Sequence, residues 1–147
     1  MRTIRLILLL VAFTMIAGAT IAAAQHGGRP LTATLLGSNE APGPGDPNGT
    51  GEATVTVNPG QGEVCYEISV EDVALPATGA HIHVAPAGTP GPVVVPLNPP
   101  DASGQSSGCA AVDRELALAI LRNPENYYVN VHTTEYPAGA VRGQLER

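Results

Sequence analysis

Two short stretches of the chain place histidines where they could share a metal ion. In Ala80–Val84 small or apolar residues alternate with histidines, and side chains on a β-strand point alternately to opposite faces of the sheet. His81 and His83, two positions apart, therefore project from the same face. We expect Ile82 to point into the core, so that both imidazoles lie on the outer, water-facing side.

The second stretch, Tyr127–His132, has the same alternation. Val129 and Val131 share one face, whereas Asn130 and His132 share the other. With both valines in the core, His132 also belongs on the outer side of the sheet. A functional site depends on whether this strand lies beside the first one, because only then do the three imidazoles meet.

Copper and zinc are the metals that such a cluster would favour, because imidazole nitrogen is a common ligand of both and affinity generally peaks at Cu(II). His81, His83 and His132 would supply three nitrogens, and water or a nearby side chain would complete the coordination. Glu40, Glu135 and Asn130 are candidates for that position, and Glu40 and Asn130 are also candidates for hydrogen bonds that orient the ligand imidazoles.

Two further residues could assist this site. Thr133 could accept a hydrogen bond from an imidazole, and Arg142 could pair with a carboxylate or steer an anion towards a metal. The alternative interpretation gives the histidines no ligand role, so that they only hydrogen-bond to loops and strand ends. The chain has no GxSxG motif and no serine with a catalytic pattern around it, so the sequence shows no Ser/His/Asp site, and we favour a non-catalytic role over an enzyme.

The first 24 residues are typical of a secretory signal peptide. Two arginines, Arg2 and Arg5, accompany an apolar run over residues 4–16, and the small residues Ala22–Ala24 follow before Gln25. The run is short for a membrane span. We therefore expect cleavage, a polar lead-in at residues 25–30, no membrane span thereafter, and a secreted, periplasmic or cell-surface location. The alternative is an uncleaved N-terminal anchor.

The chain after the predicted signal is acidic. The whole sequence has 13 acidic and 7 basic residues and a net charge of −6, which becomes −8 when Arg2 and Arg5 leave with the signal. A domain without a basic cluster is not expected to bind nucleic acid or anionic membranes. The absence of tryptophan argues against a surface that stacks carbohydrate rings.

Cys65 and Cys109 are the only cysteines. An even number of cysteines in an exported chain usually forms disulfides, and closing a loop of this length stabilises the fold by roughly 2–4 kcal/mol. The alternatives are two free thiols or a metal ligand, although Cys109 lies in neither a CxxC nor a CxH motif.

The remaining pattern predicts an all-β fold. In residues 63–71 apolar and polar residues alternate strictly, as in a strand with one buried face. Seven or eight such short strands, separated by proline- and glycine-rich turns, predict an antiparallel Greek-key β-sandwich or barrel. One short helix is expected between an N-cap at Asp113 and a stop at Asn123–Pro124.

Five separated blocks, in order, resemble the CHRD domain, which is named for its repeats in chordin. They are Gly37–Pro42, Ala80–His83, Gly88–Val94, Tyr128–Thr133 and Tyr136–Leu145. The resemblance covers nearly all of the chain after the signal, and we set the expected domain at residues 31–146. It implies an extracellular β-sandwich found in chordin antagonists of bone morphogenetic proteins and in exported microbial proteins, with no settled activity for the microbial members.

A weaker resemblance is to copper/zinc superoxide dismutases, which are also Greek-key barrels. In those enzymes an HxH strand, a later histidine and an arginine surround copper, and here His81, His83, His132 and Arg142 follow in that order. Their metal-bridging histidine and zinc-ligand loop have no counterpart, since residues 84–130 contain no histidine. The fold is therefore expected to be immunoglobulin-like or superoxide-dismutase-like, and the resemblance supports a metal site far better than dismutation.

The sequence thus predicts an exported protein with one CHRD domain that acts without catalysis. It would serve as a binding or structural module of the extracytoplasmic space, with a protein or a matrix or envelope component as its unidentified partner. The alternative prediction is a copper- or zinc-binding domain, with or without redox activity, that uses His81, His83 and His132.

Overall fold

The computed structural model describes residues 27–147, so the predicted signal peptide at residues 1–24 lies outside the described part of the chain. Eight strands form one sheet in the order β5-β4-β7-β8-β1-β2-β3-β6, and all neighbouring strands are antiparallel. The strands are β1 (Arg29–Leu36), β2 (Thr50–Asn58), β3 (Glu63–Glu71), β4 (Gly79–Val84), β5 (Val93–Leu97), β6 (Gln105–Ala111), β7 (Tyr127–His132) and β8 (Val141–Gln144).

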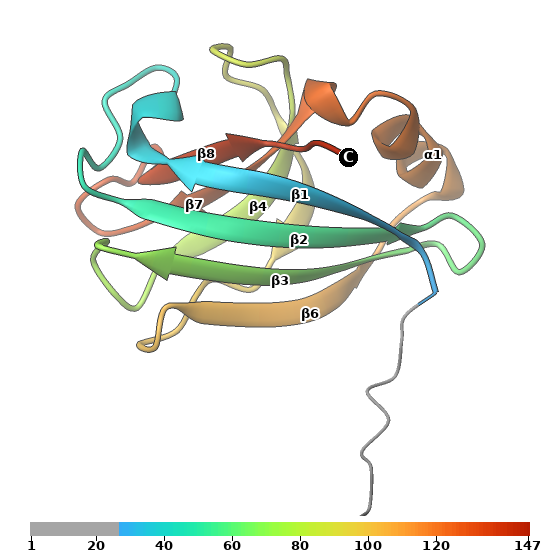
Figure 1. Cartoon of the computed structure of the whole chain (residues 1–147), viewed down its shortest axis with the longest axis horizontal. Coiled ribbons are helices and arrows are strands. Elements are labelled where there is room, and N and C mark those ends of the chain that lie inside the picture. Colours follow the sequence, from blue (N-terminus) through green and yellow to red (C-terminus); the bar gives the residue numbers. More distant parts are fainter. Residues whose placement is uncertain (1–26) are drawn as a thin grey trace, which may run out of the picture.

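This sheet curls until its two end strands, β5 and β6, contact each other, which makes a nearly closed barrel. Figure 1 shows β1, β2, β3 and β6 as a front layer, with β4 and β7 behind it. Several neighbours in the sheet are distant in the chain: β4 pairs with β7, β8 with β1, and β3 with β6. The predicted antiparallel barrel or sandwich is confirmed, and these long connections bring the two histidine-bearing strands together.

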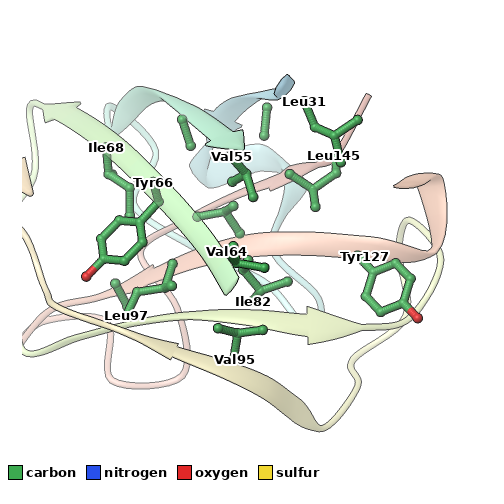
Figure 2. Packing of buried hydrophobic residues seen from close by; sticks show 14 of the residues in the cluster. Leu31, Val55, Val64, Tyr66, Ile68, Ile82, Val95, Leu97, Tyr127 and Leu145 are labelled. Atoms are coloured by element: carbon green, nitrogen blue, oxygen red, sulfur yellow. The ribbon is translucent and has the colours of Figure 1, made fainter. Parts of the chain in front are cut away.

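The core lies between the two layers. Val55 and Val64 from the front layer and Ile82 and Val95 from the other belong to the same apolar cluster (Figure 2). Ile82 of β4 and the two valines of β7, Val129 and Val131, are also fully buried there. Because strand residues alternate between faces, the histidines of both strands project away from this core, as predicted.

The predicted helix is present as α1 (Arg114–Arg122), which covers one end of the barrel and buries Ala117 and Ile120 (Figure 1). Asp113 is its N-cap residue, but the Asp113 side chain makes no capping hydrogen bond. The chain then continues through a short 3-10 helix, η2 (Pro124–Asn126). Within residues 27–147, no helix has the length and apolar character needed to cross a membrane.

A disulfide joins Cys65 of β3 to Cys109 of β6, which lie directly opposite each other in adjacent strands. It excludes the alternative of two free thiols, since no cysteine of the described chain is free. Glu63 lies near both sulfurs, yet sulfurs bonded to each other are not available as thiolate ligands. The disulfide therefore has a structural role on the front layer of the barrel.

Candidate functional site

The outer face of β4, β7 and β8, meaning the face turned away from the core, carries a row of polar side chains. The strand register aligns His81 of β4 with Asn130 of β7, and Asn130 with Arg142 of β8. Two residues further along, the register aligns His83 with Tyr128 in the same way. Side chains directly opposite on one face are close enough to interact, so the register itself assembles the site.

The three histidines meet on this face. One ring nitrogen from each of His81, His83 and His132 lies within 4.8 Å of the other two. The ring centroids are 5.1 Å apart for His81 and His132 and 5.6 Å apart for His81 and His83. Gly79 lies opposite His132 and leaves room for both neighbouring rings, because a Cβ there would lie 3.3 Å from Cε1 of His81. We call these three residues the histidine cluster.

Backbone carbonyls fix the orientation of two of these rings. Nδ1 of His83 lies 2.8 Å from the carbonyl oxygen of Gly91, and Nδ1 of His132 lies 3.1 Å from that of Pro137. A carbonyl oxygen can only accept, so each Nδ1 must carry the proton and donate it. In the neutral ring the other nitrogen, Nε2, then has a free lone pair, which is the form that binds a metal.

Those lone pairs have no partner within the protein. Six buried side-chain atoms of residues 27–147 lack a hydrogen-bond partner, and all six come from this face or from Glu40, which packs against it. Buried polar atoms in native proteins are nearly always paired, so this concentration indicates a place for a ligand. The six atoms are Nδ1 of His81, Nε2 of His83, Nε2 of His132, Oδ1 of Asn130, Nη1 of Arg142 and Oε1 of Glu40.

The histidine cluster is less exposed than expected. His83 is only 8% exposed, and His81 and His132 are half-buried, because the loops after β4 and β7 cover the outer face. Burial lowers the pKa of all three imidazoles, and the nearby rings lower the pKa of His81 and His132 further. The three rings are therefore neutral at neutral pH, as metal ligands must be.

Glu40 lies at the end of the short 3-10 helix η1 (Gly37–Asn39) and reaches the outer face from the side. Its Oε2 accepts a hydrogen bond from Nδ2 of Asn130 at 3.4 Å, and its carboxylate packs against Gly139, where a Cβ would collide with it. Burial raises the pKa of Glu40 to about 7, although Arg142, Asn130 and the Ala41 backbone favour the charged form.

Arg142, which could pair with a carboxylate or steer an anion according to the sequence, is buried in the structure. Its side chain is 1% exposed, and its guanidinium carbon lies 3.4 Å from the centroid of the Tyr128 ring. Its Nη2 donates to the carbonyl oxygen of Pro86 at 3.0 Å. Burial lowers its pKa, with Tyr128 and Glu40 opposing that shift. Arg142 thus holds the loop after β4, in addition to lying in the polar row.

Sequence reasoning missed the groups that orient the imidazoles. Thr133 and Glu40 were the expected acceptors, but Oγ1 of Thr133 accepts from the Tyr136 backbone and Glu40 accepts from Asn130. The carbonyls of Gly91 and Pro137 do this instead. A backbone carbonyl has no residue-type signal, and the only hint is that both residues lie in blocks that resemble the CHRD domain.

The comparisons with known proteins agree with these blocks. A family model described as the CHRD domain matches residues 31–145. Searches of curated proteins and of solved structures found no match. A CHRD domain and a disulfide both fit an extracellular location. Because the family model covers most of the sequence, from the third residue of β1 to beyond the end of β8, the chain belongs to the CHRD domain family.

Proposed function

We propose that this protein is an exported metal-binding module whose histidine cluster holds one copper or zinc ion. The observation that carries the proposal is the convergence of three imidazoles, each with a buried nitrogen that has no partner. His81 would bind through Nδ1, and His83 and His132 through Nε2. Glu40, Asn130 and Arg142 would surround the site rather than bind the ion.

The distances fit this proposal after a small adjustment. Copper or zinc lies about 2.0–2.1 Å from imidazole nitrogen, so two nitrogens on one ion are at most about 4 Å apart. The nitrogens of the histidine cluster lie within 4.8 Å of each other. Binding would therefore draw the rings together by roughly 1 Å, which is within reach of side-chain motion.

The metal site belongs to a wider function of the domain. We propose that residues 1–24 are removed on export and that residues 31–146 act in the extracytoplasmic space. Residues 25–30 would form a lead-in, the last two residues of which already belong to β1. There the domain would serve as a binding or structural module for a protein or for a matrix or envelope component. No catalytic step is needed for that function.

The first test is the metal content and the thermal stability of the exported protein, purified without a histidine tag. We expect close to one copper or zinc ion per chain by elemental analysis. A ligand that binds only the native state stabilises it by about 2.7 kcal/mol at 100 times its Kd, so titrated metal should raise the Tm by about 10 °C. If neither Cu(II) nor Zn(II) raises the Tm, the proposal is wrong.

Single substitutions then test which residues bind. His81→Gln, His83→Gln and His132→Gln should each remove a ligand and weaken binding by at least about 100-fold, because each leaves only two nitrogens. The matched control is His26→Gln, which changes the one remaining histidine of the chain and should leave the Kd unchanged. An equal loss of metal affinity in all four variants, or a loss of affinity only in His26→Gln, would mean that the metal binds outside the histidine cluster.

A further inference from the structure

The ring of Tyr128 packs between His83, a proposed metal ligand, and the buried guanidinium of Arg142. One face of its ring stacks on His83, with the ring centroids 4.8 Å apart and the ring planes 9° from parallel. Arg142 also lies over the ring, with its guanidinium carbon 3.4 Å from the centroid. Since β7 lies between β4 and β8 in the sheet, the two contacts come from opposite sides of Tyr128. The phenol ring is 2% exposed, so little space is left for it to move.

The rings of Tyr128 and His83 both hydrogen-bond to one residue of the loop after β4, Gly91. The Gly91 N–H donates to the Tyr128 hydroxyl at 3.1 Å, and the Gly91 carbonyl accepts from Nδ1 of His83 at 2.8 Å. Tyr128 therefore acts on His83 twice, directly through the stacked ring and indirectly through Gly91, whose carbonyl oxygen accepts the hydrogen bond from Nδ1. Nδ1–H on the carbonyl leaves Nε2 as the nitrogen that is free to bind.

Arg142 and Gln144 hold the other end of this loop. Nη2 of Arg142 donates to the carbonyl oxygen of Pro86, and Nε2 of Gln144 donates to that of Ala85 at 2.7 Å. The loop is thus tied to the outer face at both ends, by side chains of β7 and β8. The position of the Gly91 carbonyl, and hence the tautomer of His83, depends on these contacts.

We infer that Tyr128, backed by Arg142, is the positioning residue that fixes the ring and the tautomer of His83 for metal binding. The inference rests on the proposed function and deepens it. It states that the orientation of the ligand His83 is set by Tyr128 and Arg142, which do not bind the ion themselves. A ligand ring that is already oriented loses less freedom on binding, and partners that orient ligand imidazoles commonly change metal affinity by 10- to 100-fold when they are removed.

The test compares two tyrosines that make the same kind of hydrogen bond. Tyr128→Phe removes the acceptor for Gly91 but keeps the stacked ring, and Tyr128→Leu removes both. Tyr66→Phe is the matched control, because the Tyr66 hydroxyl accepts the Asn98 N–H at 2.8 Å and lies in the other layer of the barrel. We expect the Kd for Cu(II) to rise about 10-fold in Tyr128→Phe and about 100-fold in Tyr128→Leu. In Tyr66→Phe it should stay within 2-fold of wild type.

A second measurement needs no metal. Nitrogen NMR of the metal-free protein should show His83 of the wild type and of Tyr66→Phe as the Nδ1–H tautomer alone. In Tyr128→Leu, His83 should be a mixture of both tautomers. In Arg142→Met, His83 should also be a mixture of both tautomers. Arg142 contacts both the Pro86 carbonyl of the loop and the Tyr128 ring, and the variant loses both contacts.

The outcomes separate this inference from the proposed function. A wild-type protein that binds neither Cu(II) nor Zn(II) overturns the proposed function, and the tautomer of His83 then decides alone whether Tyr128 positions the ring. Metal binding by the wild type with an unchanged Kd in both Tyr128 variants overturns the inference only. A mixed His83 tautomer in the wild type overturns the inference in either case.

Discussion

Burial shifts the pKa of the acidic group of this site and the pKa of its basic groups in opposite directions, because in both cases it favours the uncharged form. It raises the pKa of Glu40 to about 7, and it lowers the pKa of the three imidazoles of the histidine cluster. The imidazoles are thus ready to bind a cation at neutral pH, while Glu40 changes its charge close to pH 7. The two kinds of group will contribute differently to stability as pH changes.

Glu40 should make the wild type lose stability as pH rises. The folded protein keeps the Glu40 proton up to about pH 7, whereas the unfolded chain releases it near the ordinary value of 4.5. The loss therefore falls between these two pH values. Glu40→Gln has no proton to release. We expect the free energy of unfolding of the wild type, relative to Glu40→Gln, to fall by about 2 kcal/mol between pH 4.5 and 8 in urea titrations, after allowing for partial exposure.

The control for that experiment is Glu71→Gln at the exposed end of β3. Its stability relative to wild type should change by less than about 0.5 kcal/mol over the same range, since exposed substitutions have small effects. A pH-independent difference for Glu40→Gln would mean that the folded barrel does not retain the Glu40 proton.

At the scale of elements, the loop after β4 decides how the site is closed. Residues 85–92 follow the last residue of β4, Val84, and fold back over His83, and contacts from β7 and β8 hold the loop there. At Gly91 the loop packs directly against the end of β4. A Cβ at Gly91 would collide with the carbonyl oxygen of Val84 and lie 2.8 Å from Cβ of Ala85. Only glycine lets the loop return this closely.

Gly91→Ala should therefore push the loop away from His83. We expect a loss of about 2 kcal/mol in stability, as for other overpacked sites, and a metal Kd at least about 10-fold higher because His83 loses its acceptor. The control is Gly88→Ala in the same loop, where φ is +74° but no atom lies within 4 Å of the added Cβ. That variant should cost about 1 kcal/mol and leave the Kd unchanged. Equal Kd values for the two alanine variants would contradict this role of Gly91.

At the scale of the whole molecule, the disulfide that stabilises the fold and the histidine cluster lie on different layers of the barrel. The disulfide lies on β3 and β6 in the front layer, whereas the histidine cluster lies on the outer face of β4 and β7 behind it (Figure 1). The apolar core lies between them, so neither feature touches the other. A change at one should therefore reach the other only through global unfolding.

Replacing both cysteines should destabilise the fold without changing the site. The bond joins residues 44 apart, and its loss in the Cys65→Ala, Cys109→Ala double variant should cost about 2–4 kcal/mol by freeing the unfolded chain. Urea titration measures this loss, and chemical reduction of the wild type should reproduce it. The metal Kd of the folded variant should stay within 2-fold, and a 10-fold change would show that the two faces are coupled.

The residue pattern alone was enough to predict the faces, the fold class and the family. Alternation has a period of two, so the expectation that Ile82, Val129 and Val131 lie in the core was sufficient to place the three histidines on the outer face, and all three apolar residues are buried. Blocks shared with the CHRD domain identified the family. Two cysteines that follow a predicted signal peptide were enough to predict the disulfide that the structure contains. Each of these depends on local order along the chain or on residue type.

Only the tertiary structure decided that β4 and β7, far apart in the chain, are neighbours, and hence that the imidazoles converge. It also decided that the carbonyls of Gly91 and Pro137 orient two of the rings, and that Arg142 is buried over Tyr128. These features arise from strand pairing and from loops that fold back over the sheet. Periodicity and composition do not encode such contacts, because every residue has a carbonyl and the closing of the barrel determines which ones face a ring.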